Sequence, residues 1–209
     1  PADLAMLNIP FVCCSYSNRY GTLIEGEYSS VSIADGDTAQ QAVEELYRHG
    51  HRRIAALISR PNDQSISQLR YEGYVQALES HGIPVDPELV ISTGGFGAKD
   101  AYRAVQEKMA ENVDFTALFA IADSMAIGAM RALMDAGRRI PEDCSVIAID
   151  GLELSAYIEP PLTTLCQPME EMGRRSAEIL LDMVRHKGSH ACELLPTTLR
   201  QGRSVAAPR

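Results

Sequence analysis

FTALFAIADSMAIGAMRALMDAGRRIPEDCSVIAIDGLELSAYIEPPLTT, residues 115–164, is the stretch that decides the fold. Within it, the apolar run 117–122 stops at Asp123, where a helical pattern begins at once. A second apolar run, 146–149, stops at Asp150. Two carboxylates therefore follow two strands that we expect to run parallel, and open α/β sheets bind ligands at the carboxyl ends of such strands. The stretch predicts a binding cleft.

The same alternation of strands and helices extends on both sides of this stretch. Strand-like runs lie at 9–15, 28–34, 54–58, 89–92, 115–121 and 144–149, and helical patterns at 38–50, 65–82, 98–110, 123–136 and 169–184. We expect Asp37 or Thr38 to cap the first of these helices. Strands that alternate with helices predict right-handed crossovers and a parallel sheet. The pieces outside the central unit either extend one sheet or belong to a second lobe.

Composition and charge limit the classes of function. The chain has 209 residues, of which 45% are hydrophobic and 22% charged, as is ordinary for a globular protein. The formal net charge of −9 argues against this segment itself gripping a phosphate backbone. No apolar run is long enough for a membrane helix. Five scattered cysteines without metal-ligand spacing favour a reducing, cytoplasmic compartment.

Catalytic, cofactor and metal sites find no support in the sequence. His49 and His51 form an HxH pattern, but they straddle Gly50 at a predicted helix end, where an imidazole suits the helix dipole without a metal. The chain lacks GxSxG, P-loop spacing and a nucleophile–base pair, and GGFG at 94–97 is not GxGxxG. We therefore expect a protein that is no enzyme and has no cofactor or metal.

Several motifs occur in an order and at a spacing that resemble those of one known family. They are GHRRIA (50–55), RxxGY (70–74), ALFAxxDxMAxGAMRAL (117–133), IPEDxSVIxxD (140–150), PPLTT (160–164), MEEMG (169–173) and LRQGRS (199–204). Together they cover nearly the whole chain. The chain thus resembles the effector-binding core of the lactose-repressor and galactose-repressor transcription regulators.

The resemblance implies an α/β fold of the periplasmic-binding-protein type (type I), with two lobes of parallel sheet flanked by helices. Three crossings near residues 34, 165 and 194 would join the lobes. The implied division is a partial N-terminal lobe at 1–34, a C-terminal lobe at 35–164, a return segment into the N-terminal lobe at 165–193, and a final crossing with the tail at 194–209. The resemblance also implies that the first lobe is incomplete and that a DNA-reading helix-turn-helix lies upstream. Because the chain opens with Pro1, we do not expect it to begin at the native translation start.

Arg70 and Asp150 are the principal ligand-binding residues that the resemblance implies. A lone helical arginine is usually solvated, but in the family the arginine of RxxG points into the cleft. Its guanidinium offers a planar fork of donors suited to vicinal hydroxyls, carboxylate or phosphate. Asp150 would accept hydrogen bonds from effector hydroxyls, and an ion pair with Arg70 is the rival account. We expect Asp123 to be structural, an N-cap near the cleft.

The chain departs from the family at two positions beside these aspartates. Ala122 stands where the family often has an asparagine that binds a sugar hydroxyl, and Gly151 where it often has a second aspartate. Each lost partner removes about 1 kcal/mol of net binding for a sugar that needs it. The departures argue against a simple hexose and favour a smaller, less polar or differently oriented effector.

The resemblance also implies a set of secondary ligand-binding residues. Phe96 matches an aromatic that stacks on sugar or purine rings, with ordinary core packing as the alternative. The others lie in a β–α loop facing the effector, on the opposite lobe and in the crossing strand. They are Gln64 and Ser65, Ser15, and Gln167.

These observations support one hypothesis and one alternative. We hypothesise that the chain is the effector-sensing domain of a cytoplasmic transcriptional repressor, which binds a sugar or sugar derivative between its lobes. It would bind operator DNA through the upstream helix-turn-helix as a homodimer, with residues 152–158 contributing to the dimer surface, and it would have no membrane partner. The alternative is a periplasmic sugar-binding protein of an uptake system.

Overall fold

The computed structural model describes residues 9–15, 28–60, 65–186 and 190–209. The chain forms two compact units. The larger unit comprises 35–63, 67–166 and 198–209, and the smaller unit comprises 1–34, 64–66 and 167–197. Apart from the short piece 64–66, the chain passes between the units at 34/35, 166/167 and 197/198. Each unit is therefore assembled from segments that are distant in the sequence.

The larger unit is built on a six-stranded sheet in the order β4-β3-β5-β6-β7-β9. Its strands are β3 (Ile54–Ile58), β4 (Val90–Ser92), β5 (Ala117–Ala120), β6 (Ser145–Asp150), β7 (Thr163–Cys166) and β9 (Thr198–Arg200). Every neighbouring pair is parallel except β7 with β9. The predicted parallel sheet is confirmed, and the carboxyl ends of its parallel strands share one edge.

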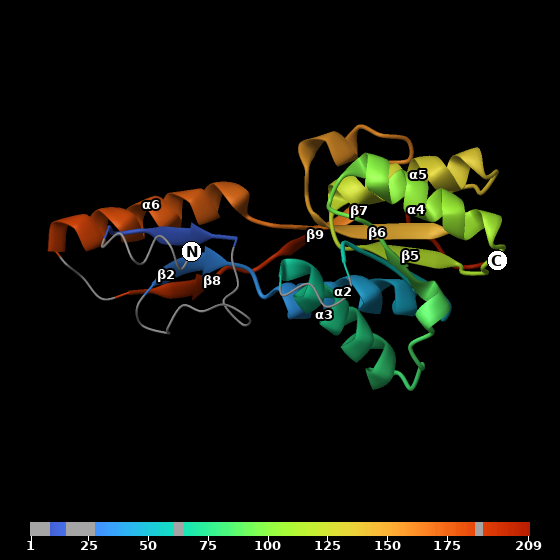
Figure 1. Ribbon diagram of the computed structural model, residues 1–209, viewed down its shortest axis with the longest axis horizontal. Helices are drawn as coiled ribbons and strands as arrows, with labels where there is room; N and C mark the ends of the chain where they lie inside the picture. Colours follow the sequence, from blue (N-terminus) through green and yellow to red (C-terminus); the bar gives the residue numbers. More distant parts are fainter. Residues whose placement is uncertain (1–8, 16–27, 61–64, 187–189) are drawn as a thin grey trace. The chain divides into compact units, whose positions relative to one another are not determined.

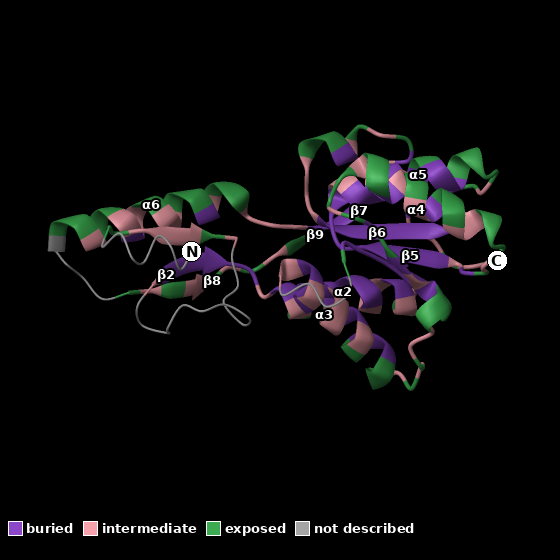
Figure 2. Cartoon of the chain, viewed as in Figure 1, coloured by how far each residue is buried: buried purple, intermediate pink, exposed green. Residues whose placement is uncertain are grey.

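Helices cover both faces of this sheet. α4 (Ala98–Ala110) and α5 (Asp123–Asp135) lie on one face, and α2 (Asp35–Arg48) and α3 (Ile66–Ser80) on the other (Figure 1). The central strands β3, β5, β6 and β7 are buried along almost their whole length, and β5, β6 and β7 are purple in Figure 2. The helices bury apolar residues at helical spacing, which in α2 are Ala39, Ala42, Val43 and Leu46.

Two glycines set how closely neighbouring helices approach. A Cβ added at Gly73 in α3 would lie 2.1 Å from the carbonyl oxygen of Gly36 in α2. A Cβ added at Gly128 in α5 would lie 2.0 Å from the carbonyl oxygen of Ala98 in α4. Because neither position has room for a methyl group, glycine is required for both helix pairs to pack as they do.

The first helix of the larger unit begins earlier than the cap pattern predicts. α2 starts at Asp35, so neither Asp37 nor Thr38 caps it, and both lie inside its first turn. The predicted strand at 89–92 is shortened to β4, because Pro87–Leu89 form a 3₁₀ turn whose first backbone donor bonds to Asp86. Leu165 and Cys166, predicted to begin a crossing, still belong to β7.

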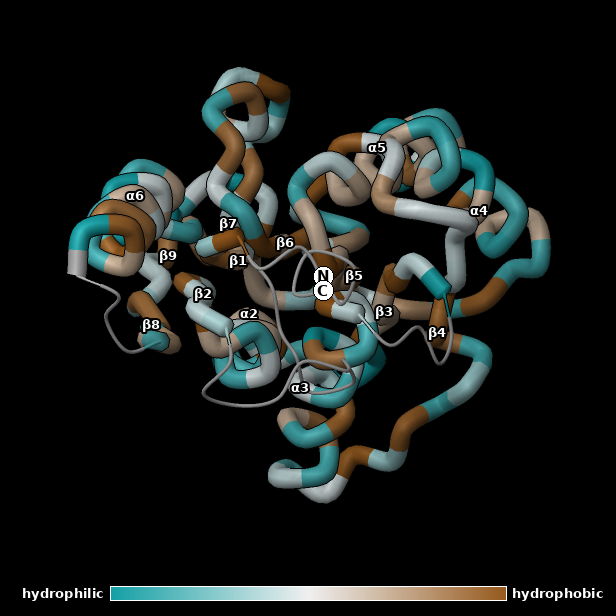
Figure 3. The backbone as a smooth tube through the Cα atoms, turned by 60° about the vertical axis from the view of Figure 1, so that its left-hand side comes forward, coloured by the Kyte–Doolittle hydropathy of each residue, from teal (hydrophilic) through white to brown (hydrophobic). Residues whose placement is uncertain are grey.

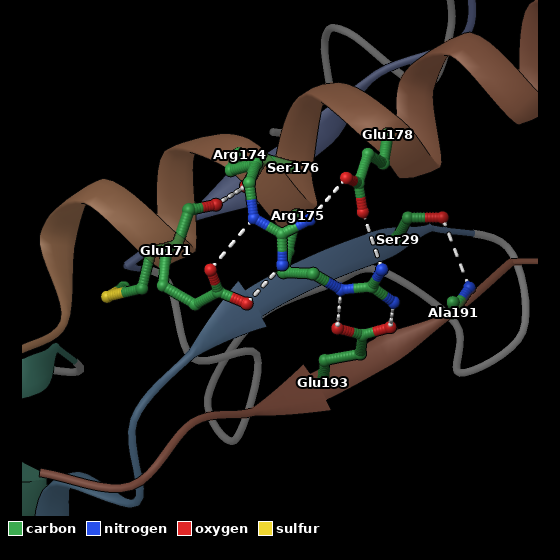
Figure 4. Close-up of polar contacts among 9 residues, drawn as sticks. Ser29, Glu171, Arg174, Arg175, Ser176, Glu178, Ala191 and Glu193 are labelled. Atoms are coloured by element: carbon green, nitrogen blue, oxygen red, sulfur yellow. Dashed lines mark hydrogen bonds and ion pairs between the residues drawn. The ribbon is translucent and has the colours of Figure 1, made fainter.

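The smaller unit is a three-stranded parallel sheet in the order β1-β2-β8, with one helix packed on it. Its elements are β1 (Val12–Cys14), β2 (Ser29–Ser32), β8 (Cys192–Leu194) and α6 (Met169–His186). Hydrophilic and hydrophobic colours alternate along α6 in Figure 3, as expected for an amphipathic helix. Arg175 of α6 directs both Nε and Nη2 to the carboxylate of Glu193 in β8 (Figure 4).

The edge of the larger sheet where its parallel strands begin is closed by a neutral polar network. The His51 ring is 1% exposed and lies 2.9 Å from Thr116 Oγ1 through Nδ1. Its Nε2 lies 2.8 Å from the carbonyl oxygen of Ala206 and 2.9 Å from Ser145 Oγ. Since a carbonyl only accepts, Nε2 carries the proton and Nδ1 accepts from Thr116. This network ties residues 204–206 to the sheet.

None of the described helices has the length and apolarity to cross a membrane.

Candidate ligand-binding edge of the larger unit

Arg70 lies at the carboxyl edge of the larger sheet and is held by three oxygen acceptors. It sits in the second turn of α3, and only 3% of its side chain is exposed. Its Nε donates to Asp35 Oδ1 at 2.8 Å. Its Nη1 donates to the carbonyl oxygen of Ile121, just beyond β5, and to Asp150 Oδ1 at 3.2 Å. The guanidinium is therefore fixed by α2, β5 and β6 together.

Asp35 lies at this edge beside Arg70 and was not among the residues that the sequence analysis named. It is the first residue of α2, its side chain is 2% exposed, and it forms the closest ion pair of Arg70. Burial raises the pKa of the Asp35 carboxyl, and the guanidinium of Arg70 opposes that rise. A buried charge requires a buried partner, so Asp35 and Arg70 depend on one another.

Asp150 joins Arg70 to the start of α5. Its Oδ1 accepts from Arg70, and its Oδ2 lies 3.3 Å from the backbone nitrogen of Asp123. The side chain is 18% exposed, and the residue has φ 139°, a conformation rarely adopted outside glycine. The ion pair between Asp150 and Arg70, which the sequence analysis held as the rival account, is present. A ligand role for either residue stays a prediction.

Asp123 is structural, but the prediction that it is an N-cap is wrong. Ala122 occupies the cap position, without a side-chain bond, and Asp123 is the first residue of α5. Its carboxylate accepts instead from the hydroxyls of Ser155 and Thr164 and from the backbone N–H of Leu152. Burial raises the pKa of Asp123, and these three hydrogen bonds oppose the rise. The carboxylate thus ties the loop after β6 to the sheet.

Arg200 braces the same loop and was missed from the sequence. Its Nη2 donates to Ser155 Oγ and to the carbonyl oxygen of Leu152 at 3.0 Å, and it lies 3.9 Å from Asp123 Oδ2. Its Nε is buried and finds no partner among the described residues. Asp35 and Arg200 lie within three residues of the points where the chain passes between the units.

The secondary candidates are dispersed. Phe96 is 42% exposed, and its carbonyl oxygen accepts from Ser124 Oγ at 2.7 Å, so it is not a core residue. Ser65 and Gln167 are half-buried, and the carbonyl oxygen of Gln167 accepts from the backbone of the first α6 residue. Ser15 has φ 54° in the smaller unit. Gln64 lies outside the described residues. Phe96 follows β4 at the carboxyl edge of the larger sheet, and a ligand role for any of the five stays a prediction.

Comparison with known proteins gives this geometry a family context. Residues 43–205 match the periplasmic binding protein-like domain. The chain is 38% identical over 177 residues to the HTH-type transcriptional repressor CytR of Escherichia coli (strain K12), covering 82% of the chain and 51% of CytR. It is 34% identical to the HTH-type transcriptional regulator CelR of Thermobifida fusca, covering 95% of the chain and 57% of CelR. The chain thus spans about half the length of the curated relatives it matches.

Two solved structures resemble the fold over nearly the whole chain. A LacI family transcriptional regulator from Enterococcus faecium with bound ribose is 30% identical, with a TM-score of 0.82, and covers 95% of this chain and 71% of its own. The chain belongs to the LacI family. The transcriptional regulator CelR in complex with cellobiose is 29% identical, with a TM-score of 0.84, covering 98% of this chain and 68% of its own.

The departure of this LacI family member at Gly151 has a steric cause. Gly151 has φ +79°, and an added Cβ would lie 2.6 Å from Cβ and Sγ of Cys166 and 2.7 Å from its Cα. Because backbone as well as side chain stands in the way, no second aspartate fits here without movement of β7. Ala122 is 3% exposed. The carboxyl edge therefore presents Asp150 without polar side chains at positions 122 and 151.

Proposed function

We propose that the chain is the effector-sensing region of a DNA-binding transcriptional repressor and that it takes up a sugar-like molecule at the carboxyl edge of the larger sheet. The observation that carries the proposal is the buried guanidinium of Arg70, fixed by Asp35 and Asp150 at the edge where α/β sheets bind ligands. Two similar regulators, whose solved structures hold cellobiose and ribose, support a sugar-like effector.

Regulation would follow from unequal affinity of the effector for two arrangements of the protein. Ligand binding favours the arrangement that it binds better, and converting a mostly bound operator to a mostly free one needs several kcal/mol of discrimination. DNA contact belongs to a part of the protein outside this chain, consistent with the net charge of −9. A cytoplasmic regulator without enzymatic activity fits the named relatives, which support it over an uptake protein.

The first test is the substitution Arg70→Ala in the full-length protein. It should abolish release from operator DNA by the cognate effector, because the ligand loses its fixed donor, while DNA affinity without effector changes little. Operator binding would be followed by fluorescence anisotropy with and without each sugar of a panel. Arg131→Ala, on the exposed face of α5, is the matched control because its side chain is 70% exposed. A normal response of the Arg70→Ala variant would remove Arg70 from the site.

Homodimerisation is part of the proposal because operators of two half-sites require paired DNA-binding heads. The loop held by Asp123 exposes Leu154 at 63% and Tyr157 at 77%. We expect Leu154→Asp together with Tyr157→Asp to convert the full-length dimer to a monomer in sedimentation equilibrium at micromolar concentration. A wild-type protein that sediments as a monomer would contradict the pairing, and a doubly substituted dimer would place the interface elsewhere.

A further inference from the structure

The hydrogen bonds of Arg70 leave one end of its guanidinium for a ligand. A guanidinium carries five N–H donors: one on Nε and two on each terminal nitrogen. Nε is committed to Asp35, and the two donors of Nη1 are matched by Ile121 and Asp150. No described residue accepts a hydrogen bond from Nη2. Its two N–H groups are therefore the donors that remain.

An arginine can bind an anion through either of two pairs of nitrogen donors, and these hydrogen bonds occupy one nitrogen in each pair. Carboxylate and phosphate are bound most strongly when two nitrogens of one guanidinium donate in parallel. The first possible fork pairs Nε with Nη2, and Asp35 occupies its Nε. The second pairs Nη1 with Nη2, and Asp150 and Ile121 occupy its Nη1. A single nitrogen with two N–H groups suits the neutral oxygen of a hydroxyl or ether.

The charges around Arg70 also disfavour an anionic ligand. Three carboxylates, Asp35, Asp123 and Asp150, lie in one polar network with Arg70 and Arg200, and Arg200 joins it through the hydroxyl of Ser155. Both cations are already paired, so an incoming phosphate would meet buried negative charge without a free cation. Arg60, after β3, is exposed and directs Nε to the carbonyl oxygen of Gly94 at 3.2 Å. Binding of a phosphate by Arg60 would not depend on Asp35. A substitution of Asp35 therefore distinguishes binding at Arg60 from binding at Arg70.

We infer that Asp35 determines the ligand class of this edge by closing the Arg70 fork, so that the site takes a neutral hydroxyl-bearing molecule and rejects its phosphorylated counterpart. This inference rests on the proposed function and deepens it. Asp35 is a positioning residue, since it acts on the ligand through Arg70. The sequence suggested that Arg70 suits hydroxyls, carboxylate or phosphate alike, and the hydrogen bonds narrow that choice to hydroxyls.

The test measures selectivity rather than affinity alone. Full-length wild-type protein would be titrated calorimetrically with matched pairs: ribose and ribose 5-phosphate, glucose and glucose 6-phosphate, cellobiose and cellobiose 6-phosphate. We expect at least one neutral sugar to bind, and to bind at least about tenfold more tightly than its phosphate. Asp35→Asn, which keeps an acceptor for Nε but removes the charge, should reduce the ratio of the affinity for the neutral sugar to the affinity for its phosphate. Asp35→Ala, which also opens the fork, should narrow it further.

Asp37→Asn is the matched control, because Asp37 lies in the same first turn of α2 and is exposed. It should leave the selectivity ratio unchanged. General damage to the fold would weaken both members of a pair alike, so a changed ratio separates positioning from stability. Should Asp35→Ala fail to fold, Asp35→Asn alone decides the question.

Three results would overturn the inference. Tighter binding of a phosphorylated sugar by the wild type would do so while leaving the proposed sugar sensor intact. An unchanged ratio in the folded Asp35→Asn variant would remove Asp35 from selectivity, again without touching the proposed function. Binding of neither member of any pair to the wild type would contradict the proposed sugar-like effector, and the inference would fall with it.

Discussion

The two compact units of this chain are held together in different ways. In the larger unit, β3 and β5 are completely buried between two helical layers, and charged groups such as Arg70 and Asp35 are enclosed with their partners. In the smaller unit, one helix covers three short strands, and the prominent polar contacts are the solvent-accessible ion pairs of Figure 4. The comparison teaches that chemistry requiring buried charge belongs to the larger unit, because only there can neighbours replace water around each charge.

The largest expected effect is on the core of the larger unit. Phe119→Ala, in the middle of β5 and 0% exposed, should lower the free energy of unfolding by about 3–5 kcal/mol. Ile179→Ala, on the buried side of α6, should cost about 2 kcal/mol, at the low end for such a truncation, because a thin core relaxes around the gap. Urea denaturation of both variants measures the difference. Equal losses of unfolding free energy in the two variants would contradict the proposed difference between the units.

Glycine substitutions should change stability with opposite signs in the two units. Gly151→Ala forces a methyl group against Cys166 at positive φ and should cost about 2–4 kcal/mol. Gly173→Ala, within α6 and with nothing within 4 Å of the new methyl, should stabilise by about 0.5–1 kcal/mol. Thermal denaturation compares the two signs.

Gly137→Ala calibrates the strain that comes from backbone conformation alone. Gly137 has φ +80° with open space around it, so its substitution should cost about 1 kcal/mol. Any excess at Gly151 then measures the contact with β7. A cost at Gly151 no larger than at Gly137 would show that β7 moves freely, and the steric account of the missing aspartate would fail.

The smallest expected effect is on the pH dependence of the free energy of unfolding. Burial lowers the pKa of His51 below its ordinary 6.5, and the hydrogen bond to the carbonyl oxygen of Ala206 opposes this shift. Between the folded and unfolded pKa values, the unfolded chain binds a proton that the folded chain does not, so stability is full above pH 6.5 and falls as the pH falls. The slope from this residue is at most about 1.4 kcal/mol per pH unit. Urea denaturation at pH 7, 6 and 5 should show a shallower slope for His51→Asn, and an equal slope would exclude His51 as its source.

The sequence predicted the central α/β elements well for a physical reason. In residues 115–150 the strands β5 and β6 coincide with apolar runs, and a carboxylate or a glycine follows or ends each element, so local pattern and tertiary burial agree. The start of α2 was placed too late, because Asp35 and Asp37 have the same local preference for a helix N-terminus. Only burial and the distant Arg70 distinguish them.

The candidate site was predictable only in part. Arg70 and Asp150 could be named as a possible pair from family-like motifs, and the structure brings them to 3.2 Å. Asp35 and Arg200 could not, since their partners lie 35 and 45 residues away and no periodicity marks them. One usable signal existed: Asp35 directly follows a strand-like run at a predicted crossing. Asp123 was misassigned because hydroxyls from later segments compete with its own helix for the carboxylate.

The antiparallel strand β9 and the residues after it have a consequence for biosynthesis. Residues 198–209 complete the larger unit, where Ser204 bridges Val146 and Thr163 and Ala206 meets His51. On the ribosome they emerge after every other segment of that unit and after α6. The nascent sheet therefore waits, with the edge strand β7 unpaired on one side, while thirty-one residues of the smaller unit (167–197) are synthesised. An exposed strand edge can pair with other chains, so we expect the order of translation to favour aggregation of nascent chains during this interval.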